Sequence, residues 1–120
     1  MKEIPKVYES EYRFCLILWE NEPISPSSLA KICKEKLEWS RTTTYTVIKR
    51  LAERGVLKNE DSLVTSLVTK DEVQGFEMSE LLEKRFEGSK LSFIAAFAKK
   101  CNLSEREIEE ITKIIENGGE

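Results

Sequence analysis

The residues best suited to chemistry lie in one short segment, residues 40–54, where hydroxyl and cationic side chains alternate with apolar ones. A single acid, Glu53, stands among them. Short hydroxyl side chains in the first turns of a helix can reach phosphate oxygens, and longer cationic side chains can reach phosphates or base edges. The segment is therefore a candidate DNA-binding helix with these candidate contact residues: Ser40, Arg41, Thr42, Thr43, Tyr45, Thr46, Lys49, Arg50 and Arg54.

Two further helices are expected before this segment. Residues 9–21 carry apolar side chains at the i, i+3, i+4 and i+7 spacing of one helical face, which predicts a mostly buried helix that ends at Pro23. Ser25 is a suitable N-cap for a second helix, with Pro26 in its first turn and an apolar face that extends to Leu37. These two helices can form the support on which the polar segment packs.

The polar segment is expected to be the third helix. Ser40 can cap a helix over residues 41–54, and Gly55 supplies the left-handed residue that ends it. Its inward side chains are then Thr44, Val47, Ile48 and Leu51. A solvated amphipathic face with tolerated β-branched residues is the alternative interpretation of its outer surface.

A β hairpin is expected next. Residues 56–58 and 63–69 are rich in strand-forming side chains, and residues 59–62 form a turn between them. Three short helices followed by a hairpin are the order of a winged helix, which favours DNA binding over a merely solvated face. We therefore expect residues 1–70 to be a winged-helix DNA-binding domain.

Residues 71–120 are expected to form a helical dimerisation domain, so that the fold class is mainly α with a small β hairpin. Three helices of this length cannot bury their apolar faces alone, and a second copy is the simplest partner. Packing of these helices back on the first domain, as a monomer, is the alternative. The side chains expected between the two copies are Met78, Leu81, Leu82, Phe86, Ile94, Phe97, Ile108, Ile111 and Ile115.

The charge distribution differs between the two parts. Residues 1–70 carry twelve Lys and Arg against ten Asp and Glu, whereas residues 71–120 carry seven against twelve. The net charges are therefore +2 and −5, which suggests different roles for the two parts.

Several function classes are excluded by composition. The 120 residues include no histidine, so there is no Ser-His-Asp arrangement and no His-based metal site. No Gly-rich phosphate loop is present, and the three cysteines are scattered, as is typical of buried thiols in a reducing compartment. We expect a protein that is not an enzyme and needs no cofactor or metal. The chain has no membrane-length apolar run and no signal-peptide pattern, so a cytoplasmic location is expected.

The segment around the third helix resembles a known family. Trp39-Ser40, Thr43, Thr46, Arg50-Leu51 and Gly55 stand in the pattern W-S-x-x-T-x-x-T-x-x-x-R-L-x-x-x-G, which is similar to the recognition helix of the penicillinase and methicillin-resistance repressors (the BlaI/MecI/CopY type). The resemblance covers nearly the whole chain. It implies a winged-helix domain, a C-terminal dimerisation domain and repression at palindromic operator DNA.

The resemblance also assigns roles to single residues. Thr43 and Thr46 match threonines that contact DNA in the family, and Arg50 matches an arginine that contacts the DNA backbone. The hairpin turn departs from the family, because Glu60 and Asp61 stand where relatives tend to be basic, and acids there repel phosphate. We therefore expect weak hairpin contacts with DNA.

The resemblance suggests how repression ends. The copper-responsive branch has a C-terminal cysteine element, whereas this chain has no cysteine after Cys101. In the β-lactam-responsive branch, a sensor-linked protease cuts an Asn-Phe bond in the fifth helix, and the aligned pair here is Ala96-Phe97. Cleavage at this bond and direct signalling by a small molecule or another signal are the two alternatives.

A different functional class is also open. The sequence pI of about 5.3 and the acidic hairpin turn are compatible with a winged-helix adaptor that binds proteins and not DNA. A salt titration of duplex binding distinguishes the two, because a repressor loses affinity steeply with salt and an adaptor has no binding to lose.

Overall fold

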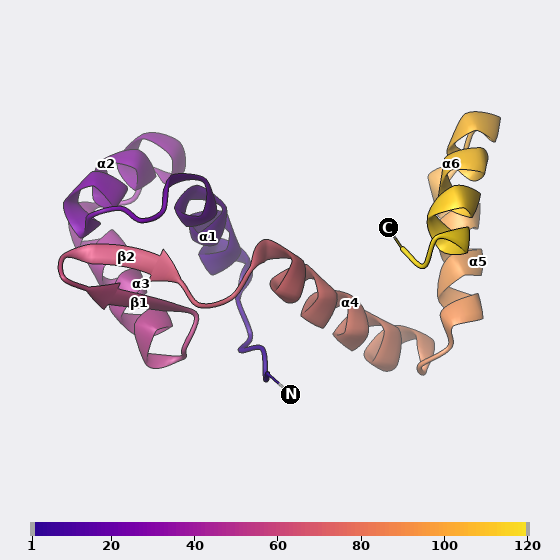
Figure 1. Ribbon diagram of the computed structural model, residues 1–120, viewed down its shortest axis with the longest axis horizontal. Helices are drawn as coiled ribbons and strands as arrows, with labels where there is room; N and C mark the ends of the chain where they lie inside the picture. The colour runs from indigo at the N-terminus through magenta and orange to yellow at the C-terminus, as the bar shows by residue number, and fades with distance from the viewer. Residues whose placement is uncertain (1, 120) are drawn as a thin grey trace. The chain divides into compact units, whose positions relative to one another are not determined.

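The computed structural model describes residues 2–119, which form six helices and one pair of strands (Figure 1). The chain divides into two compact units, Met1–Met78 and Ser79–Glu120. The predicted order of three helices, a hairpin and three further helices is confirmed. The elements are α1 (Glu9–Asn21), α2 (Pro26–Leu37), α3 (Arg41–Glu53), β1 (Leu57–Glu60), β2 (Leu63–Ser66), α4 (Lys70–Phe86), α5 (Lys90–Cys101) and α6 (Glu105–Glu116).

The predicted helix caps are present. The Ser25 hydroxyl accepts a hydrogen bond from the Ser28 amide at 3.2 Å and so begins α2. The Ser104 hydroxyl accepts from the Glu107 amide, and the Glu107 carboxylate accepts from the Ser104 amide, which forms a capping box at α6. Each cap satisfies amide groups that the first turn of a helix leaves without a partner.

The core of the first unit lies where α1, α2 and α3 pack together with the hairpin. Phe14 and Leu18 of α1 are fully buried, and the Phe14 ring stacks on Trp39 with 5.9 Å between ring centroids. Each fully buried apolar side chain of this size stabilises the fold by about 1.5–3 kcal/mol. As predicted, α3 turns these side chains inward: Thr44, Val47, Ile48 and Leu51.

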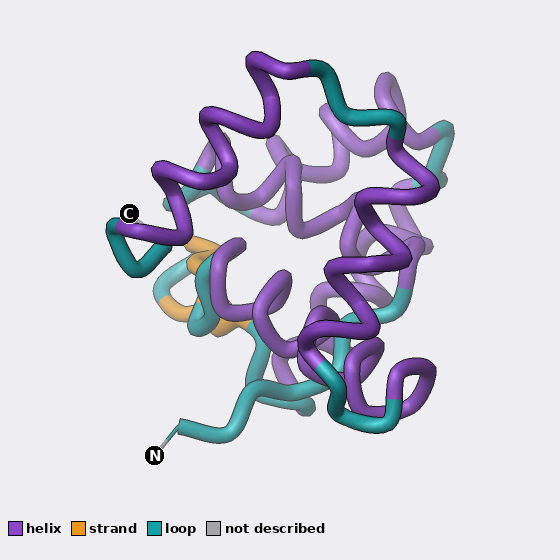
Figure 2. The backbone as a smooth tube through the Cα atoms, turned by 90° about the vertical axis from the view of Figure 1, so that its right-hand side faces the viewer, coloured by secondary structure: helices purple, strands orange, loops and turns teal. Residues whose placement is uncertain are grey.

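The hairpin has a shorter turn than the sequence predicted. Only Asp61 and Ser62 form the turn, with φ of +52° and +64°, so residues 59 and 60 belong to β1. Two residues with positive φ are the signature of a type I′ turn, whose twist matches that of the strands. The second strand ends at Ser66 and not at residue 69. Figure 2 shows the two strands, and Ile24 adds an isolated antiparallel bridge to Val64 of β2.

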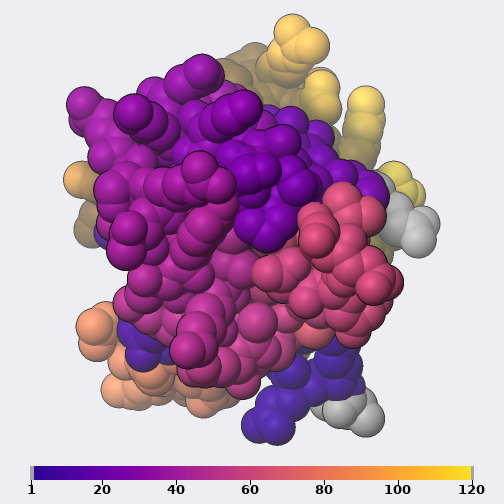
Figure 3. All heavy atoms as spheres, turned by 90° about the vertical axis from the view of Figure 1, so that its left-hand side faces the viewer, coloured from indigo at the N-terminus to yellow at the C-terminus, as the bar shows by residue number. Residues whose placement is uncertain are grey.

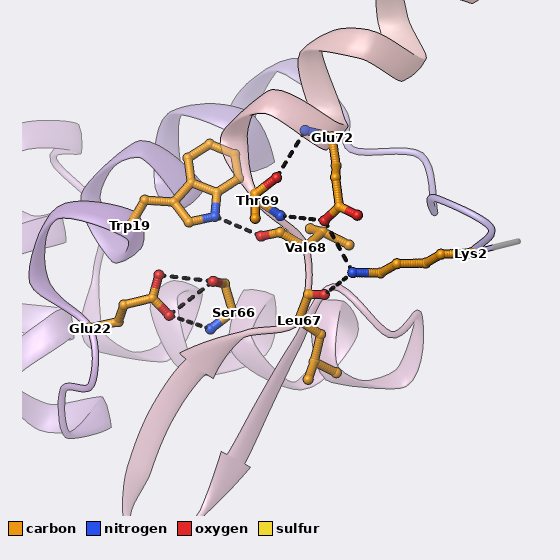
Figure 4. Close-up of polar contacts among 8 residues, drawn as sticks. All are labelled: Lys2, Trp19, Glu22, Ser66, Leu67, Val68, Thr69 and Glu72. Carbon is orange, nitrogen blue, oxygen red and sulfur yellow. Dashed lines mark hydrogen bonds and ion pairs between the residues drawn. The ribbon is translucent and has the colours of Figure 1, made fainter.

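The base of the hairpin is fixed to the end of α1 (Figure 4). The Glu22 carboxylate accepts hydrogen bonds from the Ser66 amide at 2.7 Å and from the Ser66 hydroxyl. The Trp19 indole N–H donates to the Val68 carbonyl oxygen at 2.9 Å, two residues after the end of β2. These bonds set the direction of the hairpin relative to α1.

The start of α4 belongs to the first unit. The Thr69 hydroxyl accepts from the Glu72 amide, and the Glu72 carboxylate accepts from the Thr69 amide and from the Lys2 ammonium group (Figure 4). Val73 is 1% exposed and joins the core. The first unit therefore extends beyond residue 70, which the sequence suggested as its end.

The second unit has no buried residue among its described positions, 79–119. The rings of Phe86 and Phe93 meet edge to face with 5.4 Å between centroids. Many of its large apolar side chains are exposed to solvent in the single chain, including Ile94, Ile108 and Ile115. The apolar surface of the second unit is therefore not covered by other residues of the same chain.

Candidate nucleic-acid interface

The outer surface of α3 carries the residues that the sequence singled out. Eight of the nine candidate side chains lie on exposed positions, and Arg54 is the exception. α2, α3 and the hairpin form one continuous surface on the side of the first unit shown in Figure 3. The packing of the inward residues against α2 and β1 fixes which side of α3 faces solvent.

The first turns of α3 are held by their own polar side chains. The Ser40 hydroxyl accepts from the Thr43 amide at 3.1 Å and lies 2.9 Å from the Thr43 hydroxyl. The Arg41 Nε–H donates to the Tyr45 hydroxyl at 2.8 Å, and its guanidinium carbon lies 5.2 Å from the centre of the Tyr45 ring. These contacts hold three hydroxyl groups and one cation in fixed positions at one end of the surface.

A buried carboxylate from α1 lies under the other end of α3. Glu11 is 2% exposed. Its two oxygens accept from the Arg54 guanidinium at 2.7 and 2.9 Å, and one of them lies 3.7 Å from Arg50 Nη1. Arg54 also donates to the Lys6 carbonyl oxygen and lies over the Tyr8 ring.

Arg54 therefore differs from the sequence expectation that it projects outward. Its guanidinium is turned toward the core and bonded at two nitrogens, with the side chain 29% exposed. Arg50, one turn earlier, keeps a side chain that is 53% exposed. Arg50 can offer donors to an external phosphate, whereas the donors of Arg54 are occupied inside the protein.

The ionisation of Glu11 reflects these contacts. Burial acts to raise the pKa of the Glu11 carboxyl. The hydrogen bonds from Arg54 and from the Tyr8 amide, together with the positive charges of Arg54 and Arg50, outweigh burial, and the net pKa lies below its ordinary value. Glu11 is thus an ionised acid whose charge is balanced by Arg50 of α3 and by Arg54, the residue that caps the C-terminus of that helix.

Two concave surfaces flank α3. One lies between α3 and the start of α1 and is lined by Ser10, Trp39, Thr42, Thr43, Thr46, Val47 and Arg50. The other lies between α3, the start of α2 and the hairpin, and is lined by Pro26, Tyr45, Ile48, Lys49, Ala52 and Asn59. The exposed ridge of α3, with a concave surface on each side, has the form required to enter the major groove between the two sugar-phosphate strands of a duplex.

The hairpin tip is acidic, as the sequence indicated. Glu60 is paired with Lys58 of the same strand at 3.7 Å between Oε2 and Nζ. Asp61 lies in the turn itself. The carboxylates at the tip oppose the approach of a polyanion to this part of the hairpin.

Three residues near α3 were missed by sequence reasoning: Glu11, Ser10 and Asn59. Glu11 occupies the apolar face of α1, at i−4 from Cys15 and i−7 from Leu18. An acid within an otherwise apolar stripe indicates a buried, paired carboxylate, and that signal was available in the sequence. Ser10 and Asn59 had no comparable signal, because only the packing of α1 and β1 beside α3 brings them to this surface.

Cysteine and acidic side chains are the groups of this chain whose types could hold a metal ion. Among residues 2–119, no group of three or more Cys, Asp or Glu side chains is placed to hold a metal ion. Burial raises the pKa of the Cys15 thiol to about 12, and it also raises the pKa of Cys33. Cys101 is exposed, contrary to the expectation that the thiols are buried, because α5 has no buried face in the single chain.

None of the helices in residues 2–119 combines the length and the apolar character that crossing a lipid bilayer requires.

Comparison with known proteins points to one family. Residues 8–117 match the family model described as "Penicillinase repressor". The penicillinase repressor of Bacillus licheniformis is 23% identical, with 97% of this chain and 94% of the relative aligned. The methicillin resistance regulatory protein MecI of Staphylococcus aureus is 27% identical, with 92% and 95% aligned.

Two solved structures share the fold. The DNA-binding domain of the repressor BlaI, determined in solution, aligns with a TM-score of 0.51 and 25% identity, covering 60% of this chain and 93% of that structure. The monomeric form of Bacillus licheniformis BlaI in complex with the blaP half-operator aligns with a TM-score of 0.52 and 24% identity over the same shares. These matches confirm the winged-helix architecture predicted from the order of the elements.

Proposed function

This chain belongs to the penicillinase repressor family, and we propose that it is a dimeric transcriptional repressor that binds palindromic operator DNA through α3. The observation that carries the proposal is the exposed row of hydroxyl and cationic side chains on α3, held by the Ser40 cap and the Arg41–Tyr45 contact. A relative with the same fold was solved on half-operator DNA, which supports duplex DNA as the partner. The membership supports a regulator and not an enzyme.

The proposed division of labour follows the chain. Residues 1–70 contain the DNA-binding surface, and residues 71–120 join two copies. In the proposed complex α3 enters the major groove, where Thr43, Thr46 and neighbouring side chains reach the duplex. The centres of the two half-sites are then about 10 base pairs apart, or a multiple of that distance, because both helices must face the same side of the duplex.

The proposed role of Arg50 is a phosphate contact, since its side chain is half-exposed and its Nη1 lies 3.7 Å from the Glu11 carboxylate. Replacing Arg50 by alanine is expected to weaken binding to all duplexes by a similar factor, because a phosphate contact carries no base information. The magnitude of the slope of log K against log salt is expected to fall by about 1 for each lost contact. Fluorescence anisotropy with a palindromic and a scrambled duplex measures both quantities.

Lys84→Ala is the matched control for Arg50→Ala. Lys84 is an exposed cation of α4 that pairs with Glu80, and it lies outside the proposed surface. Its loss is expected to leave the salt slope unchanged. An Arg50→Ala protein that binds at low salt as tightly as the wild type would exclude the proposed docking.

Dimerisation through the second unit is proposed on the basis of its exposed apolar side chains. α6 alone presents Ile108, Ile114 and Ile115 to solvent in the single chain, and α5 presents Ile94 and Phe97. Soluble proteins rarely leave contiguous apolar surfaces of this kind uncovered. A second copy covers both faces at once, because a two-fold interface pairs the same surface on the two chains.

Release of the operator is proposed to follow cleavage between Ala96 and Phe97, by a sensor-linked protease of the host. The bond lies inside α5, so the helix must open before a protease can reach it. α5 has no buried residue, and the alanines beside the bond offer little packing to resist opening. A cut here divides the second unit and removes the tether between the two DNA-binding units.

Cleavage makes a direct prediction. A host culture exposed to a β-lactam is expected to accumulate a fragment that ends near residue 96, detected by immunoblot with an antibody to the first unit. Ala96→Asn restores the residue that the family resemblance places before the cut, and it is expected to increase the yield of fragment. An intact chain together with full derepression would show that another signal controls this protein.

A further inference from the structure

The face of α2 next to α3 carries a basic surface that the recognition helix does not include. Ser27, Lys31 and Lys34 follow each other at i, i+4 and i+7, so they lie along one side of the helix. All three are exposed. They line a concave surface together with residues at the start of α3, and the complete lining is Ser27, Ala30, Lys31, Lys34, Ser40 and Arg41.

We propose that this concave surface between α2 and α3 binds backbone phosphates of duplex DNA, with Lys31 and Lys34 as the contact residues. The inference rests on the proposed function and extends it to residues outside α3. In this proposal α2 contributes directly to the affinity for DNA and does not contribute to base recognition.

The charge of this surface is complementary to a phosphate. Three cations line the concavity and no acid does so. Neither Lys31 nor Lys34 forms an ion pair within residues 2–119. Their ammonium groups are therefore available to an external anion, unlike the guanidinium of Arg54, which Glu11 occupies.

The position of the surface favours the DNA backbone as its occupant. The major groove is bounded by two sugar-phosphate chains, and a helix seated in it presents one flank to each. On one flank of α3, Ser10 of α1 and Arg50 line a concavity. Near the start of α3, the concavity with Lys31 and Lys34 adjoins Arg41. Arg50 on one flank and the cations beside the start of α3 thus lie at two separate places along the ridge, where each can meet a backbone phosphate.

Small side chains let the backbone approach α2 closely. Ala30 is buried and Ser27 is short. No large side chain therefore fills the concavity between the two lysines and the start of α3. A serine hydroxyl can donate to a phosphate oxygen, as it does in many protein–DNA contacts. Lys36, two residues after Lys34, instead lies beside Arg13 and Glu20 of α1, on a different side of α2.

The test compares Lys31→Gln and Lys34→Gln with Lys36→Gln as the matched control on the same helix. The probe is a random-sequence 30-base-pair duplex, because phosphate contacts do not depend on sequence. Binding of the full chain is measured by fluorescence anisotropy between 50 and 200 mM salt. Thermal unfolding followed by circular dichroism is recorded for every variant, so that altered stability is distinguished from a lost contact.

Each of Lys31→Gln and Lys34→Gln is expected to lower the magnitude of the salt slope by about 0.9 per bound head. Its affinity deficit relative to the wild type then shrinks by about 3-fold between 50 and 200 mM salt. Lys36→Gln is expected to keep the slope of the wild type.

The outcomes separate this inference from the proposed function. If the wild type binds the duplex but all three variants share its slope, the α2 surface has no role in DNA binding and the inference is wrong. If the wild type binds no duplex even at 50 mM salt, the proposed function itself fails, and the inference fails with it.

Discussion

A protein in which both Ile108 and Ile115 are replaced by glutamate is expected to be monomeric and to bind its operator about 100-fold more weakly than the wild type. The two side chains are 50% and 64% exposed in the single chain, and their spacing of seven residues places them on one face of α6. Carboxylates at these positions remain hydrated in a monomer. In a dimer they would be taken out of water without a partner, which disfavours association strongly.

The loss of affinity follows from the tether between two DNA-binding units. Once one unit of a dimer is bound, the other meets its half-site at a high effective concentration, in the millimolar range for short linkers. Avidity of this kind exceeds the affinity of one unit by about 100- to 10,000-fold, without any new contact. The variant loses this factor although its α3 surface is unchanged.

Lys113→Glu is the control for the double variant. Residue 113 is an exposed position of α6 that faces away from residues 111 and 115 by helical spacing, and the change introduces a carboxylate there. Sedimentation is expected to give a dimer for the wild type and the control, and a monomer for the double variant. A wild type that sediments as a monomer at micromolar concentration would contradict the proposed dimer.

Replacing Arg54 by methionine is expected to lower the free energy of unfolding by about 3 kcal/mol at pH 7, because the buried Glu11 carboxylate loses its bidentate partner. Glu11 is 2% exposed and cannot regain water without disturbing α1. Arg50 and the Tyr8 amide still interact with it, which places the effect at the lower end of the range for broken buried pairs.

The destabilisation depends on pH in a defined direction. In the folded wild type the pKa of Glu11 lies below its ordinary value near 4.5, so the stabilisation is fully present above that value and is lost as pH falls through the folded pKa. Without Arg54, burial is opposed less strongly and the pKa of Glu11 rises. The difference between wild type and variant is therefore expected to be larger at pH 7 than at pH 4, as measured by urea unfolding at both values.

Arg50→Met provides the matched comparison, since Arg50 lies on the same helix and near the same carboxylate. Its nitrogen is 3.7 Å from Glu11 and its side chain is 53% exposed, so its removal is expected to lower the free energy of unfolding by about 0.5 kcal/mol. Replacing Arg54 is thus expected mainly to lower stability, whereas replacing Arg50 is expected mainly to weaken DNA binding. Equal destabilisation by the two substitutions would show that Arg54 is not the main partner of Glu11.

Local sequence signals were sufficient to predict the helices of this protein and their order. The hydroxyl caps at Ser25, Ser40 and Ser104 act on amides three residues away, and the helical period of the apolar residues sets which side of α3 turns inward. These are short-range effects, so the sequence determines them directly. The order of three helices and a hairpin then implied the winged helix and an outward row of hydroxyl and cationic groups.

The length of the hairpin turn depended on more than strand propensity. Residues 59 and 60 have turn-like side chains, yet they pair with β2 because two residues of positive φ close the hairpin with the twist of the strands. The end of β2 was likewise set by distant groups, since Trp19 and Glu22 bond to the chain around Ser66.

The sequence by itself determined the helices, their caps and the outward row of α3, whereas only the tertiary structure decided which of its cations are free. Arg50 and Arg54 lie one helical turn apart, and the helical period alone does not distinguish them. The packing of α1 against α3 places Glu11 under Arg54, 43 residues away along the chain, and so directs Arg54 inward. The same packing of α2 beside α3 brings Lys31 and Lys34 to Arg41. Both arrangements depend on how one helix packs against another, and no local period or propensity encodes that packing.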